Sequence, residues 1–391
     1  MTAYIAGYAR TPYTKMNGAL ASLSAVRLGA LAIEQALLNA QIATGHVDLV
    51  VGGHVIQTGC GQNPARQSAV AAGIRNDVPA LTINSVCLSG ADAVIWATQQ
   101  IELGLADVVV VVGQESMSNA PHALRGSRQG HKYGAAAMID TLEIDGLTDA
   151  FSGESMGLAT QKVSDAAGLT REEMDRFAVA SHQRAEASRD WVNKEIAPIT
   201  IGGRGGDTVV STDDGIRTDI SMESVGALRP AFSKDGTITA ANSSPLTDGA
   251  AALVVVSEKW KAKYTDGPYL AEVVASARVA GPDYSLNLQP ANAIKAALKR
   301  AGLTVSDLNQ IEINEAFAAV GVASTADLGI DPARVNVDGG AIAIGHPIGS
   351  SGARIVGHLA RNLKREGAGT IGAVGICGGG GQGVGVVLRA L

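Results

Sequence analysis

The sequence is poor in several features that mark particular classes of protein. Its 391 residues include only three cysteines, none spaced as a disulfide framework or a metal clip, which favours free thiols in a reducing cytoplasm. No apolar run approaches the ~18 residues of a membrane span. The net charge of −6 argues against nucleic-acid binding. The N-terminus has no charged segment before an apolar stretch, so we expect no signal peptide.

Aromatic residues are also scarce, and what replaces them indicates the fold class. Aromatics make up 4% of the chain, whereas hydrophobic residues make up 46% and glycine occurs 48 times. Cores built from Ala, Val, Leu and Ile, with tight glycine turns, are typical of strands covered on both faces by helices. The length predicts two or three domains of this α/β type.

An internal repeat divides the chain into two similar halves. Ser89–Gly113 aligns without a gap with Ser351–Gly375, and both segments open Ser-Gly-Ala and end Val-Gly. Upstream, Leu31–Gly53 aligns with Asn292–Asn314 at nearly the same offset, 261 against 262 residues. Each 25-residue segment reads as an amphipathic helix followed by a buried strand. The repeat therefore predicts two strand–helix halves related by pseudo-symmetry.

Between the halves the α/β rhythm is interrupted by charged and glycine-rich segments. One helix is predicted there, over Arg171–Trp191, with a Thr-x-x-Glu capping box that begins at Thr170. A buried strand over Ala250–Ser257 then completes the first half, and Tyr269–Ala275 opens the second. Such an insertion could be decorative, but a long insertion beside reactive groups more often covers a ligand.

Cys87 is placed for nucleophilic chemistry. It lies between a strand, Ala80–Asn84, and the first repeated helix, where the positive end of the helix dipole favours a thiolate. The alternative is a small buried core cysteine. Cys60 matches no catalytic pattern, and we interpret it as structural.

His346 follows Gly345 and precedes Pro347 in a glycine-rich loop. In the repeat this loop is the counterpart of the Cys87 loop, so pseudo-symmetry is expected to bring the two together. The imidazole could deprotonate Cys87 and later polarise a thioester carbonyl. A hydrogen-bonded loop histidine is the simpler interpretation.

Two further candidates follow strands of the second half. Cys377 comes after a buried strand, Thr370–Val374, and precedes four glycines whose N–H groups could form an oxyanion hole. A flexible turn is the alternative. Asn314 follows another strand and could be a helix N-cap, but the repeat places it on the same sheet edge as the other groups.

Together these motifs resemble the signatures of the thiolase family. They are Val86-Cys87-x-Ser89-Gly90, Asn314-Glu315-Ala316-Phe317, Gly339-Gly340-Ala341-x-Ala343-x-Gly345-His346-Pro347-x-Gly349, and Cys377-x-Gly379-Gly380-Gly381-x-Gly383. The resemblance implies a layered α-β-α-β-α fold with two halves built on mixed five-stranded sheets. The expected parts are 1–118 with 246–268, an inserted loop domain over 119–245, and 269–391.

The resemblance also implies a ping-pong reaction between thioesters. Cys87 would carry the acyl group and His346 would activate it, while Cys377 would move the α-proton of the second substrate. One oxyanion hole would use His346 with a water held by Asn314. The other would use the N–H groups of Cys87 and Gly379.

Coenzyme A contacts are implied mainly within the insert. The matching positions are Leu147, Met156, Arg217, Phe232 and Ser244, with Ala316 and Phe317 near the acyl end. A basic segment resembles the loop that the family uses for tetramer contacts, and its residues are Arg125, Arg128, His131 and Lys132. We therefore expect a homotetramer, with no metal and no cofactor besides coenzyme A thioesters.

Within the family, the segments 113–118 and 145–151 resemble acetyl-CoA acetyltransferases. This predicts reversible condensation of two acetyl-CoA to acetoacetyl-CoA and CoA; a longer-chain 3-ketoacyl-CoA thiolase is the alternative, and a non-catalytic carrier a remote one. Four residues depart from the usual family pattern, and they are Leu88, Ser155, Pro245 and Gly378.

Overall fold

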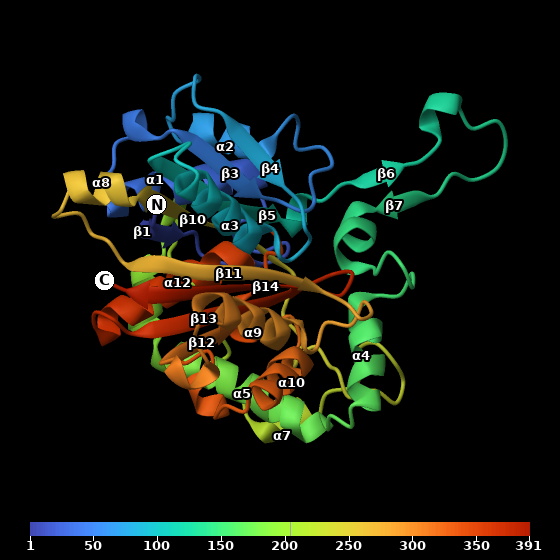
Figure 1. Ribbon diagram of the computed structural model, residues 1–391. Helices are drawn as coiled ribbons and strands as arrows, with labels where there is room; N and C mark the ends of the chain where they lie inside the picture. The colour runs from blue at the N-terminus through green and yellow to red at the C-terminus, as the bar shows by residue number, and fades with distance from the viewer. Residues whose placement is uncertain (204) are drawn as a thin grey trace.

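The computed structural model describes residues 1–203 and 205–391. Within these residues, ten strands form one mixed sheet in the order β12-β13-β14-β11-β1-β10-β5-β3-β4, with β2 (Thr14–Lys15) beside β10. The two halves of this sheet meet at β1 and β11, where only Tyr4–Glu272 and Ile5–Ala271 are paired. Figure 1 shows the two halves stacked one above the other, with helices between and outside them.

Besides the two-residue β2, the first half contributes five strands to the sheet. They are β1 (Ala3–Arg10), β3 (Leu49–Gly53), β4 (Ala80–Ile83), β5 (Val108–Ser116) and β10 (Thr247–Ser257). Strands β3, β4 and β5 are parallel, while β10 runs antiparallel to β5 and to β1. The helices of this half are α1 (Ala25–Ala40), α2 (Pro64–Ala71), α3 (Ser89–Glu102) and α8 (Glu258–Lys263).

The second half repeats this pattern with one strand fewer among the residues described. Its strands are β11 (Ala271–Ala280), β12 (Gln310–Ile313), β13 (Ile371–Gly378) and β14 (Gln382–Ala390). Where a fifth strand was expected, beside β12, a single parallel bridge joins Ile311 to Val335. The helices are α9 (Gln289–Ala301), α10 (Ala318–Leu328), α11 (Ala341–Ile344) and α12 (Ser351–Glu366).

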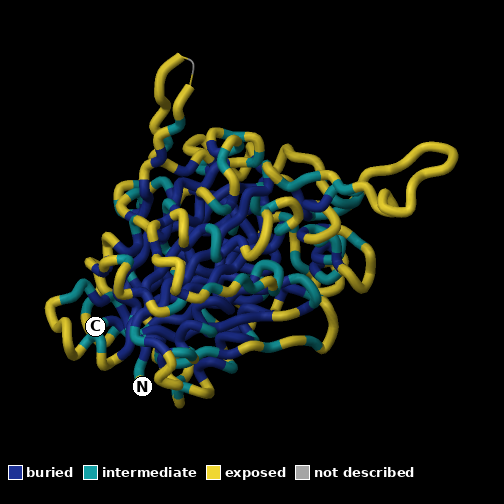
Figure 2. Tube along the Cα trace, turned by 90° about the horizontal axis from the view of Figure 1, so that it is seen from above, coloured by how far each residue is buried: buried dark blue, intermediate teal, exposed yellow. Residues whose placement is uncertain are grey.

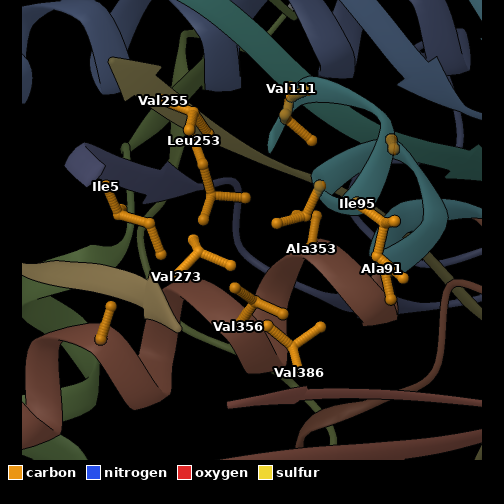
Figure 3. Packing of buried hydrophobic residues seen from close by; sticks show 14 of the residues in the cluster. Ile5, Ala91, Ile95, Val111, Leu253, Val255, Val273, Ala353, Val356 and Val386 are labelled. Carbon is orange, nitrogen blue, oxygen red and sulfur yellow. The ribbon is translucent and has the colours of Figure 1, made fainter. Parts of the chain in front are cut away.

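The repeated Ser-Gly-Ala segments explain how the halves pack together. Helices α3 and α12 each begin at the serine of this segment, and they cross in the middle of the molecule. A Cβ on Gly352 would lie 2.3 Å from the backbone nitrogen of Ala91, and one on Gly90 would lie 2.6 Å from that of Ala353. The glycines therefore allow backbone-to-backbone contact. Figure 3 shows side chains of both helices in the buried core beside this crossing.

The insert between β5 and β10 combines short strands with helices. Its principal elements are β6 (His122–Leu124), β7 (Met138–Asp140), the π-helix η4 (Glu143–Leu147), α4 (Met156–Ala166), α5 (Arg171–Ala187), α6 (Arg189–Val192), β8 (Ile199–Ile201), β9 (Thr208–Val210) and α7 (Met222–Gly226). The predicted capping box at Thr170 and Glu173 is confirmed, and the predicted helix divides at Ser188 into α5 and α6.

The hairpin formed by β6 and β7 projects from the body of the protein (Figures 1 and 2). All residues from 124 to 138 are exposed. Over the residues that the structure describes, no helix has the length and apolarity needed to cross a membrane.

Candidate active site

A strained turn positions Cys87 between β4 and α3. Val86, which precedes it, has a φ of 54°, an unusual conformation for a β-branched residue. Ser89 stabilises this turn, because its hydroxyl donates to the carbonyl of Val86 at 2.6 Å and accepts from the N–H of Ser85 at 2.9 Å. Backbone strain of this kind is concentrated at functional sites, and here it fixes the position of the thiol.

The surroundings of Cys87 keep its thiol protonated. Burial raises the pKa of Cys87 to about 12, and the nearby Glu115 carboxylate adds to this effect. The backbone N–H groups of Cys87 itself and of Gly379 face the sulfur and act in the opposite direction. The expectation that the helix dipole would favour a thiolate is therefore wrong, because desolvation is the larger effect. The thiol needs a base before it can react.

His346 is held between the two halves. Gly345 has a φ of 120°, and a Cβ there would lie 2.7 Å from the side chain of Thr247. This close approach lets the N–H of His346 donate to the Thr247 hydroxyl at 3.1 Å. The turn around Gly345 therefore requires glycine and ties the histidine loop to β10.

The imidazole of His346 is neutral, and one of its nitrogens has no hydrogen-bond partner among the described residues. Its Nδ1 lies 2.6 Å from the hydroxyl of Ser351, whereas Nε2 is buried and has no hydrogen-bond partner in the described chain. Burial lowers the pKa of His346 to about 3, and the positive charge of Arg354 contributes. A neutral imidazole with one free nitrogen can accept a proton.

Asn314 lies beside this imidazole and is not a helix N-cap. It follows β12, and its N–H donates to the carbonyl of Gly375 at 2.9 Å. Its side-chain nitrogen is 3.5 Å from His346 Nδ1, and its Oδ1 has no partner within residues 1–203 and 205–391. Helix α10 begins four residues later, with Phe317 at its N-cap. The amide is therefore available at the site.

Cys377 lies inside β13, three residues beyond the expected strand end at Val374. It pairs with Gly383 of β14, and its side chain is fully buried. Burial raises the pKa of the Cys377 thiol well above its usual value, and the proximity of Cys87 raises it further. The glycines that follow form the tight β13–β14 turn rather than a flexible segment: a Cβ on Gly381 would lie 2.0 Å from the carbonyl oxygen of Asp283. The two thiols are thus neighbours.

Most residues expected to contact coenzyme A gather around the two thiols. Met156, Phe232, Ala316 and Phe317 belong to the same apolar cluster as Cys377, and the rings of Phe232 and Phe317 meet edge to face at 6.0 Å. Leu147 packs in the cluster that contains Cys87. The Ser244 N–H and hydroxyl each donate to the carbonyl of Ala316 at 3.0 Å.

Arg217 is a different case. It is exposed and lies outside the two clusters. Its backbone N–H donates to Nδ1 of the buried His182 at 3.1 Å, so the backbone is fixed while the guanidinium faces solvent. Its contact with coenzyme A stays a prediction.

The four departures have local structural roles. Ser155 is the N-cap of α4 and accepts from the N–H of Leu158. The carbonyl of Pro245 accepts from the hydroxyl of Thr247, which in turn holds His346. A Cβ on Gly378 would lie 2.6 Å from the Leu88 side chain, so a small residue at one position accommodates a large residue at the other.

Sequence reasoning missed three residues that position the site. Ser351 contacts the imidazole, Thr247 holds the histidine loop, and Glu115 accepts hydrogen bonds from the N–H groups of Val55, Ile56 and Gly349. Only Ser351 had a signal in the sequence, because it aligns with Ser89 in the repeat.

A duplicated α/β fold that brings two thiols, a neutral imidazole and inward-facing N–H groups together is suited to carrying acyl groups on cysteine. Two family models match the chain: the thiolase N-terminal domain over residues 3–259 and the thiolase C-terminal domain over residues 268–390. The chain therefore belongs to the thiolase family.

Individual relatives cover nearly the full chain. A probable acetyl-CoA acetyltransferase from Mycolicibacterium smegmatis is 52% identical over 384 residues, covering 97% of this chain and 98% of the relative. An acetyl-CoA acetyltransferase from Cupriavidus necator is 45% identical and covers 98% of both chains. The crystal structure of human mitochondrial 3-ketoacyl-CoA thiolase matches with a TM-score of 0.95 at 36% identity, over 100% of this chain and 99% of that one.

Proposed function

We propose that this protein is an acetyl-CoA acetyltransferase that reversibly condenses two acetyl-CoA molecules to acetoacetyl-CoA and CoA. The observation that carries the proposal is the proximity of Cys87 and Cys377, with the N–H of Gly379 facing the Cys87 sulfur. The full-length similarity to proteins named acetyl-CoA acetyltransferase supports the same reaction. A carrier that binds coenzyme A or lipid would need neither thiol.

In the first half-reaction, Cys87 attacks the carbonyl carbon of acetyl-CoA. Its proton passes to Nε2 of His346, which is neutral and lacks a protein partner among the residues described. The N–H groups of Cys87 and Gly379 would stabilise the oxyanion, because they already face this sulfur. The departing CoA thiolate takes the proton of the Cys377 thiol, which leaves Cys377 as a thiolate, and the acetyl group stays on Cys87 as a thioester.

In the second half-reaction, Cys377 removes a proton from the methyl carbon of another acetyl-CoA. The resulting enolate attacks the acetyl group on Cys87, the bond to the Cys87 sulfur breaks, and acetoacetyl-CoA is released. The Cys87 thiolate then takes its proton back from His346. His346, together with a water held by Asn314, would stabilise the enolate oxygen. Running the steps in reverse gives thiolysis, with Cys377 protonating the departing enolate. No further cofactor takes part in these steps.

Ser351 would allow His346 to serve both half-reactions. Its hydroxyl lies 2.6 Å from His346 Nδ1 and 3.1 Å from the carbonyl of Pro347. When the hydroxyl donates to Pro347, it accepts from Nδ1–H, and Nε2 is free to act as a base. When it donates to Nδ1, the proton resides on Nε2, which can then donate to an oxyanion.

We also propose that the protein is a cytoplasmic homotetramer that acts in fatty acid metabolism. Strand β4 has an unpaired edge within the described sheet, with Leu81 42% exposed, which suits pairing with a second copy. The β6–β7 hairpin would join two such dimers. It exposes Leu124, Tyr133 and Met138 beside the basic residues Arg125, Arg128, His131 and Lys132. Three free cysteines support a reducing compartment.

The substrate range is tested by comparing CoA-dependent thiolysis of acetoacetyl-CoA with that of a long-chain 3-ketoacyl-CoA. We expect a higher kcat/KM for acetoacetyl-CoA, because Met156 and the Phe232–Phe317 pair crowd the region around Cys377. A preference for the long substrate would instead assign the chain to longer-chain 3-ketoacyl-CoA thiolysis. Absence of activity on both would favour the carrier.

A further inference from the structure

Glu315 follows Asn314 directly, and neither proposed half-reaction uses it. Its side chain is buried, and both of its carboxylate oxygens accept hydrogen bonds. Oε1 accepts from the side-chain amide of Asn336 at 2.7 Å, whereas Oε2 accepts from the Ser181 hydroxyl at 2.6 Å and from the N–H of Ile342 at 3.0 Å. One carboxylate therefore joins the end of β12 to the insert and to the histidine loop.

The contact with Asn336 fixes the end of β12, where Asn314 lies. The side-chain amide of Asn336 accepts from the N–H of Ile313 and donates to its carbonyl, both at 2.8 Å. Because the same amide also donates to Glu315, it holds the residues on both sides of Asn314. The side-chain nitrogen of Asn314 is thereby held 3.5 Å from Nδ1 of His346.

The contact with Ile342 fixes the short helix that leads to His346. Ile342 lies in the first turn of α11, where an accepting carboxylate satisfies one of the N–H groups that a helix leaves free at its start. A Cβ on Gly340 would lie 2.2 Å from Cδ of Glu315, so only glycine lets the carboxylate approach this closely. The carboxylate thus sets the start of the helix whose end is followed by Gly345 and the imidazole.

Ser181 connects the insert to the same carboxylate. It lies in α5, and its hydroxyl donates to Glu315 while accepting from the N–H of Gly340 at 3.0 Å. The next residue, His182, accepts from the backbone of Arg217, which is expected to contact coenzyme A. The hydroxyl of Ser181 therefore ties the start of α11 to the insert.

These contacts require an acceptor at both oxygens of Glu315. Burial raises the pKa of Glu315, and the hydrogen bonds from Ser181 and Asn336 act in the opposite direction. A glutamine would keep the size of the side chain, but its NH₂ group only donates and would face another donor. Asn336 cannot turn its amide round without losing both contacts to Ile313. The substitution therefore changes the geometry without opening a cavity.

We propose that Glu315 is a positioning residue, which holds Asn314 and His346 at the spacing that the proposed reaction requires. This role rests on the proposed function, because it acts through two groups of that reaction. A displaced base or hydrogen-bond donor stabilises the transition state less, whereas coenzyme A is bound by other residues. We therefore expect the loss of Glu315 to lower kcat with little change in KM.

Kinetics of acetoacetyl-CoA thiolysis compare Glu315→Gln with Glu312→Gln. Glu312 is a second buried carboxylate, three residues earlier in β12, and its Oε2 has no hydrogen-bond partner in the described residues. Glu315→Gln should lower kcat by about 10- to 100-fold and change KM by less than about threefold. Glu312→Gln should keep kcat within about threefold of the wild type. Equal values of kcat in the two folded variants overturn the proposal.

Alkylation by iodoacetamide gives a second measure, which needs no thioester. Trypsin places Cys87 and Cys60 in different peptides, so the alkylation rate of Cys60, which lies outside the site, serves as the internal standard. Because His346 is the base for Cys87, the ratio of the Cys87 rate to the Cys60 rate should fall at least about fivefold in Glu315→Gln. General loosening of the fold would not lower this ratio. An unchanged ratio in folded Glu315→Gln overturns the proposal.

Ser181→Ala decides the matter if Glu315→Gln does not fold. It removes one donor and no charge, so we expect kcat to fall by about three- to tenfold and the ratio to fall with it. Its control is Ser324→Ala, which removes a buried hydroxyl of α10 that donates to the carbonyl of Asn287 at 2.8 Å. Equal effects of the two serine substitutions overturn the proposal.

The two measures separate this role from the proposed function. A wild type that turns over no thioester, together with a lowered ratio in Glu315→Gln, would overturn the proposed function and support the role of Glu315. An active wild type with the same ratio in all variants would support the proposed function and overturn the role of Glu315.

Discussion

The starts of α3 and α12 show how one repeated segment came to serve two tasks. Both helices begin Ser-Gly-Ala, and the glycines fulfil the same role by allowing the two backbones to touch. The serines differ. Ser89 binds only backbone groups and holds the strained turn before Cys87, whereas Ser351 binds the imidazole of His346. The packing of the two helices is alike in both halves, whereas the polar side chains have diverged. The repeat therefore predicts the backbone arrangement of the site better than the chemical roles of its side chains.

The largest effects should come from removing either catalytic thiol, Cys87 in the first half or Cys377 in the second. Cys87→Ala should abolish the acetyl-sized mass increase seen with acetyl-CoA and lower turnover by more than about a thousandfold, because no covalent intermediate can form. Cys377→Ala should still acquire the acetyl group but fail to condense. Mass spectrometry of the intact protein, followed by a turnover assay, separates the two steps.

The third cysteine offers the matched control for these variants. Cys60→Ser should keep both acetylation and turnover. Acetylation that persists in Cys87→Ala, or normal turnover by Cys377→Ala, would show that the two halves do not divide the reaction as proposed.

The backbone arrangement of this site could be predicted from the sequence because it depends on local patterns. The aligned Ser-Gly-Ala segments predicted both central helices, and the repeat placed Cys87, His346, Cys377 and Asn314 on one sheet edge. Their protonation states were not accessible. The helix dipole suggested a thiolate at Cys87, but burial by residues distant in sequence is the larger effect and raises the pKa.

Contacts made by residues far apart in the chain were also beyond sequence reasoning. Glu115 and Gly349 are 234 positions apart, and the contact between Thr247 and His346 spans 99. No periodicity or motif links such pairs. The second half likewise lacks a regular fifth strand in the described residues, because on the side of β12 away from β13 there is a single bridge, between Ile311 and Val335.

The divergence of the two serines gives the next prediction. Ser351→Ala should lower kcat by roughly 10- to 100-fold, with a small change in stability, because the imidazole loses the hydroxyl that sets its tautomer. Ser89→Ala should mainly lower the free energy of unfolding, by about 1–2 kcal/mol, because the turn at Val86 loses two hydrogen bonds. Steady-state kinetics and urea unfolding of both variants test the contrast. Equal losses of kcat at unchanged stability would mean that both serines act on the chemistry.

The shared role of the glycines predicts a purely structural effect, with no change in the chemistry of the site. Gly352→Ala should destabilise the protein by about 2–3 kcal/mol, since its Cβ would lie 2.3 Å from the backbone of Ala91, where neither helix can move freely. Gly226 in α7 is the control, because a Cβ there meets nothing within 4 Å. Thermal unfolding should show a clear loss for Gly352→Ala and none for Gly226→Ala. Similar melting temperatures for the two variants would contradict close backbone contact between α3 and α12.

The smallest expected effect concerns Leu88 and Gly378, which come from different halves, depart from the family pattern and lie against each other. Leu88 precedes α3, Gly378 ends β13, and a Cβ on Gly378 would lie 2.6 Å from the Leu88 side chain. Gly378→Ala alone should therefore destabilise the protein, but in a Leu88→Ala background the added methyl group fills vacated space. A double-mutant cycle should give a coupling free energy of about 1 kcal/mol between the two positions. Additive free energies would mean that Leu88 and Gly378 do not constrain each other. The turn after Cys377 would then tolerate a side chain whether or not position 88 holds a large residue.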